Sequence, residues 1–171
     1  MRRILIVGCC GAGKTTLANE LSKRLNLPVV HLDRLWWNPG WIESTPEKFD
    51  ARLAAELLRE CWIIDGNYKR TLAERLRYAD TVLLLAYSRT RCLWQIFRRL
   101  REFHGRTRPD LADGCPERID GEFLRFVWNF NRRVLPEVRQ ILAQRPAGCT
   151  LREFHTPAET ERFLSSLPPA R

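Results

Sequence analysis

The chain has 171 residues, of which 44% are hydrophobic and 29% are charged, and its formal charge is +9. This length and composition are typical of one globular domain with a substantial core. No apolar run approaches the roughly 18 residues of a membrane-spanning helix, and the first apolar run is shorter than that of a secretory signal. We therefore expect a single domain over residues 1–171, located in the cytoplasm.

Six cysteines are spread along the chain, at positions 9, 10, 61, 92, 115 and 149. None of them forms the C-x-x-C pair of common zinc and redox sites. We expect free thiols in a reducing compartment rather than a framework of disulfides or zinc.

The positive charge comes from arginine, with 25 arginines against four lysines. Residues 89–108 contain seven arginines and one acid, Glu102, which gives a local charge of +6. The planar guanidinium fork suits phosphate oxygens, so nucleic acids and phosphorylated small molecules are both compatible with this bias.

Apolar runs typical of buried strands alternate with helical patterns along the chain. The expected strands are 3–7, 28–32, 61–65, 81–87 and 149–154. The expected helices are 14–25, 45–60, 90–103, 122–144 and 156–167, with Pro136 dividing the fourth. Thr45 and Thr156 each precede a proline and are expected to be N-caps. The alternation predicts an α/β layered fold, with a parallel sheet buried between helices on both faces.

The segment GCCGAGKT, from Gly8 to Thr15, matches the pattern G-x-x-x-x-G-K-[ST] between an expected strand and an expected helix. In this context the pattern predicts a phosphate-binding loop, whose glycines let backbone N–H groups close around phosphate oxygens. Lys14 is expected to reach the β- and γ-phosphates and to be catalytic, and the Thr15 hydroxyl is expected to bind Mg²⁺. The nucleotide-binding residues that follow from the motif are Gly8, Gly11, Ala12, Gly13, Lys14, Thr15 and Thr16.

Two aspartates follow expected strands, at the end where ligands gather in open α/β sheets. Asp65 ends the strand 61–65, and we expect it to hold Mg²⁺ directly or through water. Asp33 follows the strand 28–32, and three roles stay open for it: contact with Mg²⁺, binding of the acceptor, or acceptance of a proton from an acceptor hydroxyl. Asp80 precedes a strand and is expected in a turn.

Residues 104–121 are rich in Gly, Pro and Asp and are expected to form a small lid. Closure of such a lid brings positive charge onto a transferred phosphoryl group, so arginines that flank or lie in it are candidate catalytic residues. These arginines are Arg98, Arg99, Arg106 and Arg108; Arg118, Arg132 and Arg133 belong to the same basic region.

The stretch HLDRLWWNPGW, residues 31–41, holds three of the six tryptophans around an Asn-Pro-Gly turn. We expect it to open a flap of about residues 33–60 on the acceptor side, with Asp33 and Arg34 facing the acceptor. At least one of the tryptophans is expected to wall the acceptor pocket, while the others anchor the flap to the helix that follows Thr45; they are Trp36, Trp37 and Trp41.

Four segments together resemble a known family: GCCGAGKTT, HLDRLWWNPGW, IIDGNY and GRTRPDLADGCPERID. The chain is similar to the nucleoside-monophosphate-kinase-like branch of P-loop kinases, and most of all to the bacterial topology modulation proteins grouped with adenylate kinases. The resemblance implies a five-stranded parallel sheet with helices on both faces, ATP and Mg²⁺ as cofactors, and a small arginine-rich lid.

The same resemblance places individual residues. Asp65 and Gly66 match the start of the Asp-Gly-Phe-Pro-Arg segment of adenylate kinases, and Arg70 stands one position beyond the arginine that grips an acceptor phosphate there. The Thr-Gly-Asp of the AMP site is absent, so adenylate kinase activity proper is not expected. Adenine is expected between the lid arginines and the loop FHTPAE, residues 154–159.

Two classes of function follow. One is a kinase that moves the γ-phosphoryl group of Mg-ATP to a small acceptor, either a nucleotide or a hydroxyl metabolite. The other is an ATP-dependent nucleic-acid-binding or DNA-topology regulatory protein, since arginine and tryptophan suit backbone contacts and base stacking. The kinase is favoured because the arginines cluster around the expected nucleotide lid and no recognition-helix motif is found. The identity of the acceptor, the choice between ATP and GTP, and the oligomeric state stay open.

Overall fold

The computed structural model describes residues 1–102 and 119–169, so most of the expected lid lies outside the described residues. At its centre is a five-stranded parallel sheet in the order β2-β5-β1-β6-β7. The strands are β1 (Arg3–Gly8), β2 (Val29–His31), β5 (Trp62–Asp65), β6 (Thr81–Leu85) and β7 (Thr150–Phe154). The predicted α/β fold is therefore confirmed.

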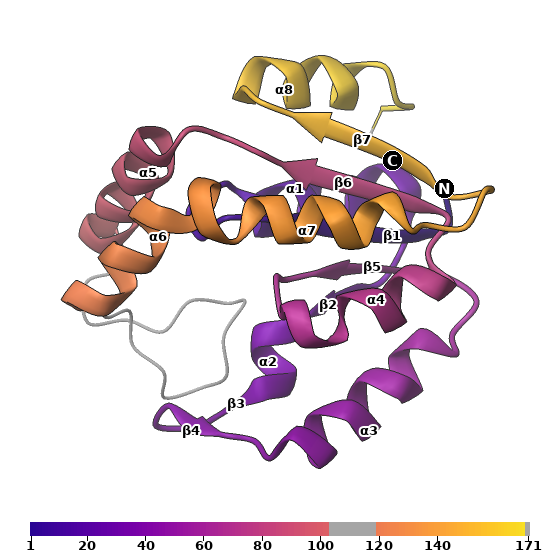
Figure 1. Ribbon diagram of the computed structural model, residues 1–171. Coiled ribbons are helices and arrows are strands. Elements are labelled where there is room, and N and C mark those ends of the chain that lie inside the picture. Colours follow the sequence, from indigo (N-terminus) through magenta and orange to yellow (C-terminus); the bar gives the residue numbers. More distant parts are fainter. Residues whose placement is uncertain (103–118, 170–171) are drawn as a thin grey trace.

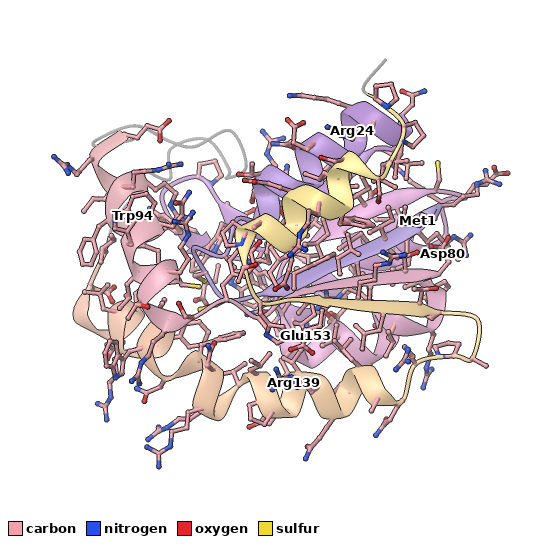
Figure 2. All side chains as sticks on the ribbon, turned by 90° about the horizontal axis from the view of Figure 1, so that it is seen from above. Met1, Arg24, Asp80, Trp94, Arg139 and Glu153 are labelled. Carbon is pink, nitrogen blue, oxygen red and sulfur yellow. The ribbon has the colours of Figure 1, made fainter. Side chains whose placement is uncertain are left out.

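Helices lie on both faces of this sheet, with α1 and α8 on one face and α4 and α7 on the other (Figures 1 and 2). The central strand β1 is covered from both sides, so that Ile4, Leu5, Ile6 and Val7 are fully buried. The helices are α1 (Lys14–Leu25), α2 (Leu32–Trp36), α3 (Pro46–Leu57), α4 (Lys69–Tyr78), α5 (Arg89–Glu102), α6 (Gly121–Arg133), α7 (Leu135–Ala143) and α8 (Pro157–Ser165). Among the described segments, no helix is long and apolar enough to cross a membrane.

The helix boundaries follow the capping chemistry of the sequence. The Thr45 hydroxyl accepts a hydrogen bond from the Lys48 N–H at 3.4 Å at the start of α3, and the Thr156 hydroxyl accepts from the Glu159 N–H at 3.3 Å at the start of α8. The long pattern over 122–144 is divided into α6 and α7 next to Pro136, which lacks the N–H that a continuous helix needs. These three predictions are confirmed.

Two regions differ from the predicted elements. The second strand ends at His31 rather than Leu32, because the fully buried Leu32 begins the five-residue helix α2, which places Asp33 in a helical first turn. Helix α4 was not predicted at all. Its buried face includes Arg75, and a charged residue at a core position hides the apolar period from a sequence pattern.

The segment after α2 forms a hairpin of two short strands, β3 (Trp37–Asn38) and β4 (Ile42–Glu43), around the Pro39-Gly40 turn. Together with α2 and α3, this hairpin extends from the β2 edge of the sheet (Figure 1). The expected flap of about residues 33–60 thus corresponds to α2, the hairpin and α3.

Candidate active site

The carboxyl ends of the parallel strands gather the predicted residues at one edge of the sheet. In the register of the strands, Asp65 at the end of β5 lies opposite Ile6 of β1 and His31 of β2. The chain leaves β1 here as the phosphate loop, residues 8–15, and enters α1. Strands β6 and β7 point toward the same side, on which α5 and α6 lie (Figure 1).

The phosphate loop depends on two glycines for different reasons. Gly13 is the N-cap of α1 with φ +86°, a left-handed conformation that side-chain-bearing residues seldom adopt. At Gly11, also in a left-handed conformation, a Cβ atom would lie 2.4 Å from the Cys92 carbonyl oxygen, so any side chain would collide with the backbone of α5. The loop is therefore packed directly on the helix that carries the predicted lid arginines.

Contacts at both ends of the loop define its shape. The Lys14 ammonium donates to the Cys9 carbonyl oxygen at 3.1 Å, so the lysine side chain folds back over the loop. At the start of the loop, the Gly8 N–H donates to Asn67 Oδ1 at 3.4 Å. Thr15 and Thr16 lie in the first turn of α1, where Thr15 is half-buried and Thr16 is exposed.

Asp65 is almost fully buried, with 5% of its surface exposed, and Oδ2 of its carboxylate lies 3.1 Å from Nδ1 of His31. The adjacent strands β2 and β5 hold these two side chains side by side. Sequence reasoning missed His31, although its position opposite Asp65 follows from two parallel strands in register. Carboxylate and hydroxyl oxygens are the ligands that Mg²⁺ prefers, so Asp65 together with Thr15 fits the predicted ion by chemistry.

Asp33 is hydrogen-bonded to Tyr68, a residue to which the sequence analysis assigned no role. The Tyr68 hydroxyl donates to Asp33 Oδ1 at 2.9 Å, across 35 positions of the chain. Burial, together with the negative charge of Asp33, raises the pKa of Tyr68 well above its usual range. Tyr68 therefore stays protonated and serves as a fixed donor to the carboxylate.

The three tryptophans of the flap separate into two groups. Trp36 packs edge-on against Phe49 of α3, with ring centroids 5.5 Å apart, and Phe49 stacks on Tyr68 at 5.0 Å. Trp37 instead pairs with Trp41 across the hairpin, at 5.1 Å. Trp36 thus belongs to the aromatic cluster beside Asp33, whereas the other two tryptophans lie on the hairpin.

The basic residues predicted near the acceptor are placed differently from each other. Arg70 forms a two-point ion pair with Asp50 of α3, with N–O distances of 2.8 and 2.6 Å. This guanidinium lowers the pKa of the Asp50 carboxyl. Arg34 lies on α2 and is exposed. Arg70 at the start of α4 is therefore engaged with Asp50 of the flap, and its predicted contact with an acceptor stays a prediction.

A cavity of about 270 Å³ opens beside the phosphate loop, between α1, α5 and α8. Its walls include Gly13 from the loop, Thr16 from α1, Arg91 and Arg98 from α5, and Pro157 from the first turn of α8. These are the two sides between which adenine was expected. Arg91 lines the cavity but was not singled out from the sequence.

The other arginines predicted in or beside the lid differ in where they lie. Arg99 is half-buried on α5. Arg106, Arg108 and Arg118 lie outside the described residues. On the outer side of α5, Trp94 projects from the helix (Figure 2), with the Arg98 guanidinium 5.4 Å from its ring centroid. Of the two candidate catalytic arginines within the described residues, Arg98 lines the cavity and Arg99 does not.

The site has two regions, which are named after the roles that the sequence predicts for them. The donor side comprises the phosphate loop and the cavity. The acceptor side comprises Asp33 and the aromatic cluster of Trp36, Phe49 and Tyr68. Asn67, between Asp65 and Tyr68 in sequence, contacts the first residue of the phosphate loop, so the two sides adjoin.

The arrangement of the sheet and helices is shared with known proteins. The model of the family described as AAA domain matches residues 4–87, from β1 to just beyond β6. Similar solved structures include a shikimate kinase from Acinetobacter baumannii in complex with shikimate (18% identity, TM-score 0.57, covering 96% of this chain and 92% of that one). The chain has the fold of the P-loop kinases. A deoxyadenosine kinase from M. mycoides with bound dATP is also similar (15% identity, TM-score 0.54, 95% and 96% covered).

A second shikimate kinase, from Bacteroides thetaiotaomicron, matches at 18% identity and a TM-score of 0.52, with 96% of this chain and 94% of that chain covered. A search of curated proteins gave no match. At these identities the likeness establishes the P-loop kinase fold, and the roles of individual residues rest on the geometry described above.

Proposed function

We propose that the protein is an ATP-dependent phosphotransferase that moves the γ-phosphoryl group of Mg-ATP to a hydroxyl group of a small molecule. The observation that carries this proposal is the pair of Asp33 and Tyr68. In this pair, a hydroxyl that stays protonated donates to a carboxylate on the acceptor side. The acceptor side adjoins the phosphate loop through the contact of Asn67 with Gly8.

On the donor side, the backbone N–H groups of the phosphate loop and Lys14 would hold the phosphates of ATP, with the helix dipole of α1 adding positive charge. The cavity beside the loop would take the base and ribose, between Arg98 on α5 and Pro157 at the start of α8. Its volume of about 270 Å³ and its position next to Gly13 support this assignment.

Mg²⁺ would be held by the Thr15 hydroxyl and the Asp65 carboxylate, which His31 orients through the contact to its Oδ2 atom. When bound, the ion offsets the negative charge of the phosphates during transfer. Lys14 and the arginines of α5 would add further positive charge on the donor side.

On the acceptor side, Asp33 would act as the general base. The acceptor oxygen attacks the γ-phosphorus, the bond from that phosphorus to the β–γ bridging oxygen breaks, ADP leaves, and the hydroxyl proton passes to the Asp33 carboxylate. Tyr68 holds this carboxylate in place through its hydrogen bond. The rings of Trp36 and Tyr68 would wall the pocket for the body of the acceptor.

A hydroxyl acceptor is favoured over a phosphorylated one because two cations of the described residues next to the acceptor side are already engaged. Arg70, the candidate to grip an acceptor phosphate, is held by Asp50, and Lys69 is paired with Glu137. The similarity to a shikimate kinase and a deoxyadenosine kinase supports a small-molecule acceptor. Similarity to the topology modulation proteins and location in the cytoplasm remain predictions.

The test is an acceptor screen that follows ADP formation from Mg-ATP with nucleosides, sugars and polyols, hydroxy acids and nucleoside monophosphates. We expect one class of hydroxyl compound to stimulate turnover, and Lys14→Ala to abolish it. Lys23→Ala is the matched control, since Lys23 lies on the same helix and pairs with Glu20 on the surface. Stimulation by nucleoside monophosphates alone would contradict the proposal.

A further inference from the structure

Arg75 on α4 has no exposed surface, which is rare for an arginine. Buried arginines are commonly paired with a carboxylate. Here the described partners are backbone carbonyl oxygens. Arg75 Nη1 donates to Gly66 at 3.1 Å, and Nη2 donates to Asn67 at 2.7 Å and to Tyr68 at 3.0 Å. One guanidinium thus holds three consecutive carbonyls.

This arrangement places a positive charge in the protein interior, where desolvation is unfavourable. Burial lowers the pKa of Arg75 to about 9, which still leaves the group protonated at neutral pH with its donors intact. An apolar side chain of similar size would avoid the desolvation of a charge at this position. The need for an arginine therefore comes from the carbonyls that it holds and from what their segment does.

The segment of Gly66, Asn67 and Tyr68 connects β5 to α4 in a conformation that the backbone does not favour. Tyr68 has φ +23° and ψ +67°, in the left-handed region, although it carries a side chain. Such positions persist where the surroundings hold them, and they concentrate at functional sites. The Tyr68 carbonyl also accepts from the Thr71 N–H at 3.1 Å, so it is held by two residues of α4.

Adjacent side chains of this segment reach both sides of the site. Asn67 Oδ1 accepts from the Gly8 N–H, at the first residue of the phosphate loop, and the Tyr68 hydroxyl donates to Asp33. The directions of both side chains depend on the backbone to which they are attached. A rotation of this backbone would move the donor-side contact and the acceptor-side contact together.

We propose that Arg75 is a positioning residue that couples the two sides of the site, because it fixes the backbone from which Asn67 meets the phosphate loop and Tyr68 meets Asp33. The acceptor-side half of this inference rests on the proposed kinase function. The donor-side half requires only that the phosphate loop binds MgATP, which makes MgATP the probe.

The test substitutes Arg75→Lys, which keeps a long basic side chain but replaces the planar fork by a single amino group that cannot hold three carbonyls in the same way. We expect the dissociation constant of MgATP, measured by calorimetry, to rise about tenfold. Hydrogen exchange at the Gly8 amide should speed up by a similar factor. Arg77→Lys makes the same change at an exposed position of α4 and should alter neither quantity.

A double-mutant cycle separates positioning from plain stability. If Arg75 acts through Asn67, Asn67→Ala should weaken MgATP binding by itself, and Arg75→Lys added to it should cause no further loss. With an acceptor from the screen, Tyr68→Phe should in the same way mask the effect of Arg75→Lys on kcat. Thermal unfolding of every variant records its stability.

The proposal is overturned if Arg75→Lys lowers the melting temperature but leaves MgATP affinity and Gly8 exchange unchanged, or if its effect multiplies with that of Asn67→Ala. If Arg75→Lys does not fold, Arg75→Gln takes its place, and failure of both to fold would assign Arg75 to stability alone and overturn the proposal. An acceptor screen without any hit would defeat the proposed function, whereas the donor-side measurements would still decide the role of Arg75.

Discussion

On the donor side, the proposed binding of phosphates depends on the backbone. Gly11 lies against the Cys92 carbonyl with no room for a side chain, and Gly13 begins α1 in a left-handed conformation. On the acceptor side, the proposed binding depends on side chains brought together from distant positions, as in the 2.9 Å hydrogen bond from Tyr68 to Asp33 and the stacking of Phe49 on Tyr68.

This difference determines which residues of each side can be substituted without loss of binding. A backbone cradle recognises what all nucleotides share, namely phosphates, and tolerates little variation because each glycine is required by the geometry. A wall of side chains can be exchanged residue by residue, so the choice of acceptor is expected to reside in α2, the hairpin and α3. Variants of the two sides should therefore differ in size of effect and in which kinetic constant changes.

The largest effect is expected from Lys14→Ala, which removes the cation of the phosphate loop. Loss of a preorganised positive charge on the transferred group should lower kcat/KM by about a thousandfold. The measurement is ADP formation with the acceptor found by screening. Turnover at the natural rate in Lys14→Ala would show that the phosphate loop is not the catalytic site, and Lys23→Ala controls for loss of a lysine from α1.

The next effect belongs to the acceptor side. Asp33→Asn keeps the shape of the side chain but cannot take a proton, so kcat should fall about a hundredfold while the KM for ATP stays near its natural value. Tyr68→Phe should cause a smaller fall, because the carboxylate remains but loses its donor. If Asp33→Asn instead raises only the KM for ATP, Asp33 serves the donor side and the base is another group.

The two sides also differ in how much of their structure could be predicted from the sequence. The phosphate loop, α1 and the sheet could be predicted because their determinants are contiguous or strictly periodic. The contact between Tyr68 and Asp33 could not, because it joins residues 35 positions apart and depends on where α4 begins. Helix α4 was itself hidden, since its core position is filled by Arg75, a residue that patterns assign to the surface.

The same distinction explains why the contacts of Arg70 and His31 were not predicted. From its position after Asp65, Arg70 was predicted to face the acceptor, but no sequence pattern reveals that α3 brings Asp50 to within 2.6 Å of it. His31 could have been found, because two parallel strands in register place it opposite Asp65. Local motifs thus identified the donor side, while the acceptor side required the packing of α3 and α4.

A smaller effect, confined to the donor side, is expected from Arg98→Ala. Arg98 lines the cavity proposed for the base, so its removal should raise the KM for ATP about tenfold and leave the KM for the acceptor unchanged. Arg101→Ala is the matched control on the exposed surface of α5. A rise in the KM for the acceptor would show that the cavity does not serve the donor alone.

The smallest catalytic effect is expected from Arg70→Ala, because this arginine is engaged with Asp50 rather than with an acceptor. Its kcat/KM should stay within about twofold of the natural value, and its stability should fall by less than about 1 kcal/mol, as for exposed ion pairs in general. A large rise in the KM for the acceptor would instead show that the pair opens and that Arg70 grips a phosphate.

The same pair gives a pH dependence with a defined sign. The pKa of Asp50 is lowered in the folded state, so the stability that the pair contributes is present above the unfolded pKa of about 4 and is lost as the pH falls through the folded pKa. The difference in melting temperature between the natural protein and Arg70→Ala should thus be constant near neutral pH and shrink below about pH 4. A difference that persists at lower pH would mean that Arg70 stabilises the flap by other contacts, such as the Phe49 ring 5.9 Å from its guanidinium, and not through the carboxylate.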